Sequence, residues 1–335
     1  MDSKLSKPVE LTGFRAISLE HGNLIGLALI IVGFWVFFAL KAPGFVSNFN
    51  IFVLLRSLSI DVVIGFSTMV VLATGGMNLA IGSIGVCAVM FSGYLMQVCG
   101  ISAAPAVVAG LALGIVLGWI NGMVIVRTGV SAFIVTLATT SLYSGAMLIL
   151  TKAQIYNQIP PGFATFARMQ VGVVPVLLLV ALAVGLGLLV LFRYSVLGRE
   201  ILSTGANARA AELSGVRVNR VIVFVHSLSG FLAALAGILL LSRLGAAMPS
   251  IGQDWLLPSF LAPVLGGTLL AGGFVSVVGT ILGALLVATI RSGLLVMQVG
   301  SFWLQLFLGL ILLFALFIER YRTLYSARRS KLGGR

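Results

Sequence analysis

The feature that most constrains this sequence is a succession of long apolar runs that follow one another from the first quarter of the chain to its end. About 20 apolar residues suffice for one helix that crosses a lipid bilayer. A transmembrane β-strand would alternate in polarity, and these runs do not, which excludes strands as the spanning element. We predict ten spans, at about residues 22–40, 51–74, 79–98, 105–126, 131–151, 173–192, 220–242, 256–271, 275–297 and 302–318.

The composition supports this assignment. Of the 335 residues, 60% are hydrophobic and only 9% are charged, whereas a soluble chain carries roughly 25% charged residues. The sequence therefore predicts an all-α membrane protein, a polytopic bundle of about ten transmembrane helices with no soluble domain. The transmembrane domain is expected at 22–318, between an N-terminal segment, 1–21, and a basic tail, 319–335.

The net charge of +13 is distributed as in an integral membrane protein, so we expect no nucleic-acid partner. With ten spans, six of the 21 basic residues fall on or near one side, and the other fifteen share the opposite side. The six are Lys41, Arg56, Lys152, Arg168, Arg243 and Arg291. An excess of basic residues marks the cytoplasmic side. Both termini are therefore predicted to be cytoplasmic, and the basic tail to contact anionic lipid.

The inner connection at 193–219 carries a predicted short helix. Asn207 is a good N-cap, the residues from Ala208 to Ser214 favour a helix, and Gly215 is a natural stop after it. The helix surface is small and neutral because it is rich in alanine. Two interpretations stay open: a solvated loop that carries arginines, or an element that docks into a groove of a cytoplasmic partner.

Two similar glycine strings interrupt the apolar runs: GGMNLAIG at 75–82 and GGTLLAGG at 266–273. Small residues let membrane helices pack closely, which is one interpretation. The other is that both strings break a helix and line a translocation path, since interrupted segments at matching places in two halves are typical of transporters. Polar residues beside the breaks, such as Asn78 and Thr268, then contact a solute or satisfy freed backbone groups.

Asp61 is the only carboxylate well inside a predicted span, and Arg56, five residues earlier, does not share its helix face. A carboxylate there lines a path or takes part in packing. The sequence has no Walker A string, no metal-ligand spacing and no catalytic set, so we expect neither an enzyme nor a bound metal or cofactor. Cys87 lies in a span and Cys99 in a short outer turn.

Several blocks between about residues 45 and 320 resemble the sequence blocks of a known family. GGMNLAIG (75–82), VSAFIVTLA (130–138), the inner segment GREILSTGANARAAELSGVRV (198–218) and the second glycine region (264–286) resemble the permease subunits of bacterial ATP-binding-cassette importers of the ribose-type sugar family. That family is related to branched-chain amino-acid permeases. The inner segment is the most specific of these blocks.

This resemblance implies a BtuC-like, type II importer permease architecture in the bacterial inner membrane. It implies a second permease subunit, two cytoplasmic ATPase subunits, a periplasmic solute-binding protein and a monosaccharide or related polyol as solute. The residues that it places in ATPase coupling are Gly198, Arg199, Gly205, Asn207, Arg209, Ala210, Ala211, Ser214 and Gly215. Those expected along the translocation path are Asp61, Gly75, Gly76, Asn78, Phe133, Thr136, Gly266, Gly267 and Thr268.

The sequence departs from the family pattern at five positions. Asn78 stands where the first glycine block usually has an acidic residue, and Asp61 where an asparagine is usual. Pro258 stands in place of an acidic residue, Phe274 in place of a basic or small residue, and Ser131 in place of a proline. These changes leave the expected architecture intact and weaken the assignment of ribose itself. Two alternatives remain: a carrier driven by an ion gradient through Asp61, and a membrane scaffold or receptor that transports nothing.

Overall fold

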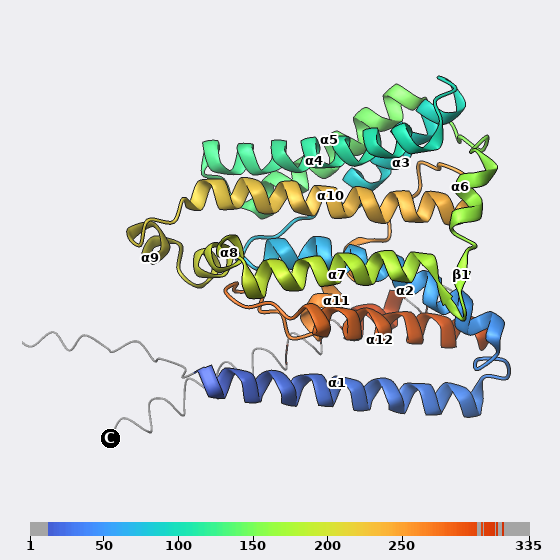
Figure 1. Cartoon of the computed structure of the whole chain (residues 1–335), viewed down its shortest axis with the longest axis horizontal. Coiled ribbons are helices and arrows are strands. Elements are labelled where there is room, and N and C mark those ends of the chain that lie inside the picture. Colours follow the sequence, from blue (N-terminus) through green and yellow to red (C-terminus); the bar gives the residue numbers. More distant parts are fainter. Residues whose placement is uncertain (1–12, 300–302, 304, 312, 314–316, 318–335) are drawn as a thin grey trace, which may run out of the picture.

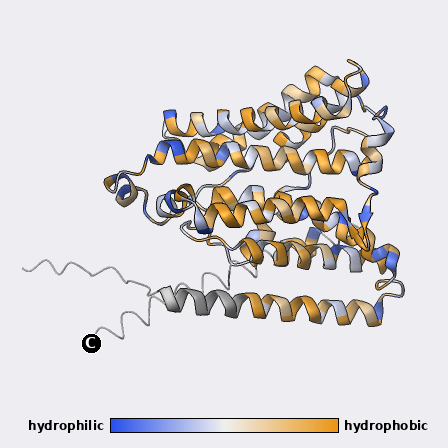
Figure 2. Cartoon of the chain, in the orientation of Figure 1, coloured by the Kyte–Doolittle hydropathy of each residue, from blue (hydrophilic) through white to orange (hydrophobic). Residues whose placement is uncertain are grey.

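Long apolar helices lie side by side along the length of the molecule (Figure 1). The computed structural model describes residues 13–299, 303, 305–311, 313 and 317. Seven helices in this part are long and apolar enough to cross a membrane. They are α1 (Gly13–Lys41), α2 (Asn48–Leu72), α4 (Ala103–Thr128), α5 (Ala132–Thr151), α7 (Val176–Tyr194), α10 (Val218–Leu244) and α12 (Val277–Val296). Hydrophobic residues dominate these helices, and hydrophilic ones gather towards the two ends of the bundle (Figure 2).

Two further apolar helices are shorter: α3 (Ile81–Gln97) and α11 (Leu256–Leu265). The predicted span at 256–271 is therefore wrong in its extent. A helix of 10 residues rises only about 15 Å, half the thickness of a bilayer core. It stops there because the following segment contains glycines with positive φ, Gly267 at 86° and Gly272 at 87°, which no helix accommodates. The predicted span at 302–318 is described only at residues 303, 305–311, 313 and 317, and all of these are helical.

The connection at 152–172 forms no span, as the sequence indicates. Its Pro161 opens the short helix α6 (Pro161–Phe166), a position at which the missing N–H of proline costs nothing. Two short antiparallel strands follow, β1 (Gln170–Val171) and β2 (Val174–Pro175). Figure 1 places this segment at the end of the bundle away from α8 (Val196–Ala206) and α9 (Ala208–Leu213).

The helix α2 forms the centre of the bundle, because every residue from Leu58 to Leu72 is buried. It packs against α7, α10, α11 and α12. The most extensive helix pair is α4 with α10, and a stripe of glycines on α4 explains it. A Cβ added at Gly118 would fall on the backbone of His226, and one at Gly114 would meet Ala234 and the carbonyl of Gly230. Small residues of this kind let membrane helices approach closely.

The inner connection folds into two helices instead of one. The predicted helix is confirmed as α9: the side chain of Asn207 accepts a hydrogen bond from Ala210 N at 3.0 Å, and Gly215 follows the helix with φ 87°. The helix α8 before it was not predicted. Its start is capped by Ser195, whose hydroxyl oxygen accepts a hydrogen bond from Gly198 N at 2.9 Å.

Candidate coupling and translocation site

The first glycine string interrupts the helical path between α2 and α3. The helix α2 ends at Leu72, α3 begins at Ile81, and the chain between them makes a turn at Gly75, where φ is 74°. Residues 76–79 carry no regular secondary structure. The interpretation of GGMNLAIG as a broken helix is therefore correct, and the break leaves backbone groups that need partners in an apolar environment.

Asn78 supplies several of those partners. Its side-chain oxygen accepts a hydrogen bond from Ala80 N at 2.9 Å, and its amide nitrogen donates to Ser229 Oγ of α10 at 2.9 Å. The hydroxyl of Ser229 in turn donates to Ser67 O of α2 at 2.7 Å, and Ser67 Oγ donates to Ser229 O at 2.8 Å. Asn78 is fully buried. Of the two uses proposed for polar residues at the breaks, Asn78 serves the backbone in this conformation.

A second anchor comes from α5. The hydroxyl of Thr136 accepts a hydrogen bond from Leu79 N at 3.1 Å and donates to Ala132 O of its own helix at 2.7 Å. Thr136 is buried, whereas Phe133, one turn earlier, is about half exposed. The block at 130–138 therefore binds the backbone of the first break through Thr136, while the ring of Phe133 is partly exposed.

The second glycine string fills the gap between α11 and α12. Gly267 has φ 86°, and Thr268 N donates a hydrogen bond to Pro263 O at 2.9 Å. The buried side chain of Thr268 accepts a hydrogen bond from Ser276 N at 3.3 Å. Gly266 lies against the backbone of Gly279, the third residue of α12, and neither position has room for a Cβ. This string is also a broken segment, so the pairing of the two strings in the sequence has a structural counterpart.

The two breaks touch each other, and α8 touches both. Gly273 N donates a hydrogen bond to Ala73 O at 3.0 Å, which joins the second break to the first. A Cβ at Gly205, near the end of α8, would fall on the carbonyl of Ala73 and close to Gly273 N. A Cβ at Gly272 would likewise collide with Gly75. Three segments far apart in sequence thus meet backbone to backbone, and glycine is required because no side chain fits between them.

The residues predicted for coupling lie on α8 and α9 or directly beside the ends of these helices. Gly198 packs against the backbone of Leu191 and Phe192, and Ala211 is buried. The other members of this set lie at the surface or half-buried: Arg199, Gly205, Asn207, Arg209, Ala210, Ser214 and Gly215. The side chain of Leu213 on α9 is 83% exposed. The helix α9 therefore presents small residues, an arginine and an apolar side chain beyond the end of the bundle (Figure 1).

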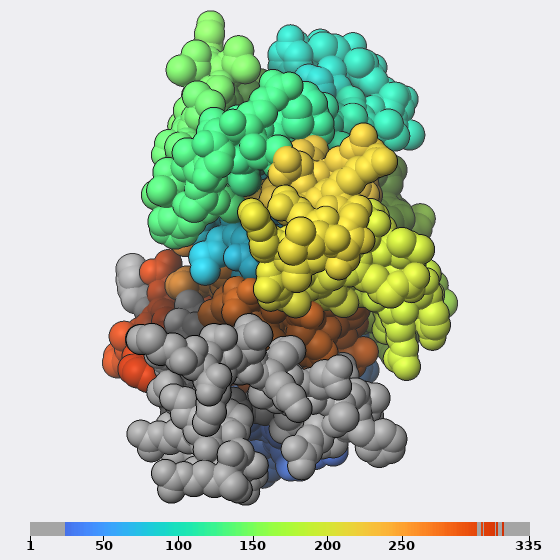
Figure 3. Space-filling view, turned by 90° about the vertical axis from the view of Figure 1, so that its left-hand side faces the viewer, coloured from blue at the N-terminus to red at the C-terminus, as the bar shows by residue number. Residues whose placement is uncertain are grey.

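The first break reaches the surface at the same end. Gly75 is exposed, and Gly76 and Met77 are half-buried. In Figure 3, which views the end that carries α8 and α9, this segment appears as the small cyan area between the green helices and the orange ones. One chain therefore leaves the break partly uncovered.

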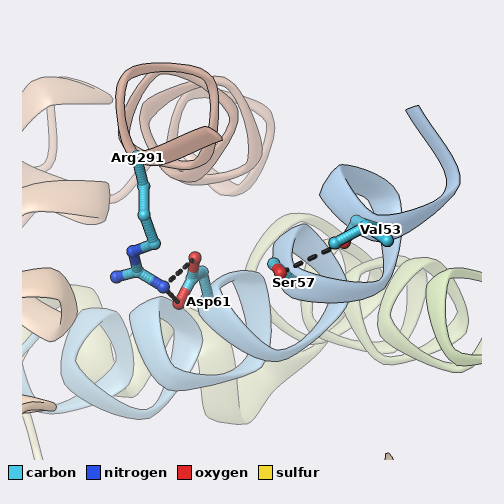
Figure 4. Close-up of polar contacts among 4 residues, drawn as sticks. All are labelled: Val53, Ser57, Asp61 and Arg291. Atoms are coloured by element: carbon cyan, nitrogen blue, oxygen red, sulfur yellow. Dashed lines mark hydrogen bonds and ion pairs between the residues drawn. The ribbon is translucent and has the colours of Figure 1, made fainter. Parts of the chain in front are cut away.

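Asp61 lies apart from this junction. Ala73 follows Asp61 by twelve positions along α2 and its C-cap, which corresponds to about 18 Å. Its carboxylate accepts hydrogen bonds from Arg291 Nη1 of α12 at 3.2 and 3.3 Å (Figure 4). The side chain of Asp61 is 7% exposed, and that of Arg291 is 33% exposed. Arg56 is not its partner, as the helix spacing predicts. The partner 230 residues away could not be identified from local spacing.

The comparison with known proteins agrees with this architecture. The family described as branched-chain amino acid transport system / permease component matches residues 50–316. The chain belongs to this family. It is a multi-pass membrane protein and a permease component of the import-system type. No solved structure matches it.

Several curated relatives belong to sugar transport systems. The ribose import permease protein RbsC of Bacillus subtilis is 34% identical over 313 residues, 92% of this chain and 95% of the relative. The fructose import permease protein FrcC of Rhizobium meliloti is 32% identical, with 89% and 84% covered. The D-allose transport system permease protein AlsC of Escherichia coli is 30% identical, with 90% and 91% covered.

Proposed function

We propose that this chain is the membrane permease subunit of an ATP-driven importer for a small hydrophilic solute, a monosaccharide or related polyol. The similarity to ribose, fructose and allose permeases supports the solute class. The chain works with a second permease subunit in the bacterial inner membrane, with both termini in the cytoplasm. A periplasmic binding protein delivers the solute, and separate cytoplasmic subunits hydrolyse ATP, since this sequence lacks a Walker A motif.

One observation carries the mechanism: the end of α8 is in backbone contact with both glycine breaks. Gly205 lies against Ala73 and Gly273, and the two breaks share the hydrogen bond from Gly273 N to Ala73 O. Because no side chain cushions these contacts, a displacement of α8 must displace the breaks as well. ATP-driven closure of the ATPase subunits would pull on α8 and α9 and thereby rearrange the interrupted segments.

The docking surface for the ATPase is α9. We expect Arg209→Glu, which reverses a charge, and Ala210→Trp, which adds bulk, to uncouple ATP hydrolysis from uptake, because both side chains are exposed. The measurement is solute uptake and stimulated ATP hydrolysis in liposomes that contain permease, ATPase and binding protein. Arg127→Glu is the matched control, since Arg127 is exposed at the end of α4, outside the 193–219 segment. Survival of both activities in both α9 variants would contradict the docking role.

The carrier hypothesis makes the opposite prediction for the isolated chain. A secondary carrier takes up solute in vesicles under an ion gradient, without nucleotide or partner. The ion pair of Asp61 with Arg291 ties up the carboxylate on which that hypothesis depends. Uptake by the chain alone would nevertheless refute the importer mechanism.

A further inference from the structure

A groove with a volume of about 430 Å³ runs between α4 and α10. The two helices are close here because a Cβ added at Gly122 of α4 would fall on the backbone of Val223 of α10. The groove lies beside that contact. Residues that line it include Trp119, Met123 and Val126 of α4, and Arg220, Phe224 and Ser227 of α10. We call it the α4–α10 groove.

The α4–α10 groove faces away from the glycine breaks. Ser229 of α10 accepts a hydrogen bond from Asn78 of the first break, whereas Ser227 lines the groove. Two positions along an α-helix differ by about 200° in direction, so these serines point to opposite sides of α10. On α4, Asn121 accepts a hydrogen bond from α5, and Met123, two positions later, lines the groove. The groove therefore opens to the outside of the bundle.

The position of the groove along the helices matches the depth of one lipid leaflet. The helices α4 and α10 have 26 and 27 residues, so each rises about 40 Å, more than the roughly 30 Å of the bilayer core. Arg220 is the third residue of α10, and Val126 is the third residue from the end of α4. In a bundle centred in the bilayer, both therefore lie near the headgroups. Ser227 and Trp119 lie seven residues deeper, about 10 Å into the acyl chains.

The groove is charged at its headgroup end and apolar below it. Arg220 is exposed and, among the described residues, forms no ion pair. It lies in the first turn of α10, where the helix dipole is also positive and favours an anion. The described residues that line the groove include no carboxylate. Trp119 and Phe224 are exposed, and the hydroxyl of Ser227 donates within its own helix.

This combination is complementary to a molecule with an anionic head and an apolar chain. A basic pocket between membrane helices on the cytoplasmic side is typical of a site for an anionic phospholipid headgroup. The other candidate occupant is a second permease subunit. A second subunit that completes the path must cover the breaks, which lie on the opposite side of α10, so the groove is left to lipid.

We propose that the α4–α10 groove binds an anionic phospholipid of the cytoplasmic leaflet. The phosphate lies at Arg220, and one acyl chain packs against Trp119 and Phe224. This inference goes beyond the proposed function, and only the choice of leaflet depends on the predicted orientation.

The test measures tryptophan fluorescence of the full chain in phosphatidylcholine nanodiscs. Brominated phosphatidylglycerol or brominated phosphatidylcholine is added at equal mole fractions, and bromine quenches a tryptophan that it contacts. The difference between the wild type and Trp119→Phe isolates the signal of the groove from that of the other three tryptophans. We expect phosphatidylglycerol to quench Trp119 at a lower mole fraction than phosphatidylcholine does.

Three variants separate the charge from the groove. Arg220→Gln should reduce the preference for phosphatidylglycerol about fivefold, because a basic side chain near the surface attracts an anionic lipid. Arg193→Gln is the matched control, since Arg193 is exposed in the last turn of α7, at the same end of the bundle (Figure 1). It should leave the preference unchanged. Ser227→Leu fills the groove without a change of charge and should abolish the preference.

The proposal is overturned if both lipids quench Trp119 equally, or if Arg193→Gln lowers the preference as much as Arg220→Gln does. It is also overturned if neither lipid quenches Trp119, because the groove is then covered by protein, such as a second copy of the chain. Uptake plays no part in this measurement, so each of these results leaves the proposed function standing. Uptake by the chain alone would refute the importer mechanism and leave the lipid site untouched.

Discussion

At the scale of single residues, Ser229 joins three elements at one point. Its hydroxyl accepts a hydrogen bond from Asn78 in the first break and donates to Ser67 O in α2, while its own helix is α10. All three residues are buried. In an apolar interior a polar group without a partner is costly, so the irregular backbone at 76–79 depends on this small network.

We predict that Ser229→Ala destabilises the protein by about 1–2 kcal/mol, because it leaves the buried amide of Asn78 without its acceptor. The measurement is the thermal unfolding midpoint of the purified chain in detergent. Ser227→Ala is the matched control on the same helix, since the hydroxyl of Ser227 donates only to Val223 O, one turn earlier in α10. An equal shift for both variants would show that the break does not depend on Ser229.

At the scale of elements, α8 is placed by glycines at both of its ends. Gly198 lets its first turn pack against the end of α7, and Gly205 lets its last turn contact both breaks. These contacts are between backbone atoms, so α8 has little freedom to shift relative to the breaks. A short helix fixed in this way transmits a displacement better than a loop does, which is the property that a coupling element needs.

We predict that Gly205→Ala reduces solute uptake by the reconstituted importer more than it reduces ATP hydrolysis. The added methyl group would fall on the carbonyl of Ala73, so α8 must move away from the breaks. Gly187→Ala in α7 is the control: it has open space at the Cβ and should be neutral or slightly stabilising in a helix interior. Normal uptake with Gly205→Ala would mean that the contact plays no part in coupling.

At the scale of the whole molecule, the proposed mechanism depends on which end of the bundle is cytoplasmic. The helices α8 and α9 lie at one end, and α6 and β1 lie at the other (Figure 1). If the end with α8 and α9 is cytoplasmic, the coupling surface faces the ATPase. The proposed coupling therefore depends on this orientation.

The native cysteines test that orientation. Cys99, in the turn after α3, is exposed, whereas Cys87 is half-buried in α3 and its thiol donates to Tyr143 O at 3.5 Å. We predict that a membrane-impermeant maleimide, added to intact spheroplasts, modifies the permease at Cys99. The variant Cys99→Ser should abolish this labelling. Labelling of Cys99 only in inside-out vesicles would show that the topology is the opposite of the predicted one.

Much of the secondary structure follows from local sequence. Hydropathy located seven of the ten predicted spans on helices long enough to cross a membrane, because each run interacts with lipid or core as one element. The runs at 79–98 and 256–271 form the shorter helices α3 and α11, and 302–318 is described only in part. The capping residues Asn207 and Gly215 bounded α9 because they act on the nearest backbone groups. The two glycine strings indicated breaks, since glycine disfavours a helix wherever it stands.

The tertiary structure alone determined the contacts between residues that are far apart in the sequence. Nothing local indicates that Gly205 meets Ala73 and Gly273, or that Arg291 pairs with Asp61. Hydropathy and capping are properties of neighbouring residues, whereas a junction or an ion pair exists only once the helices are packed in one arrangement.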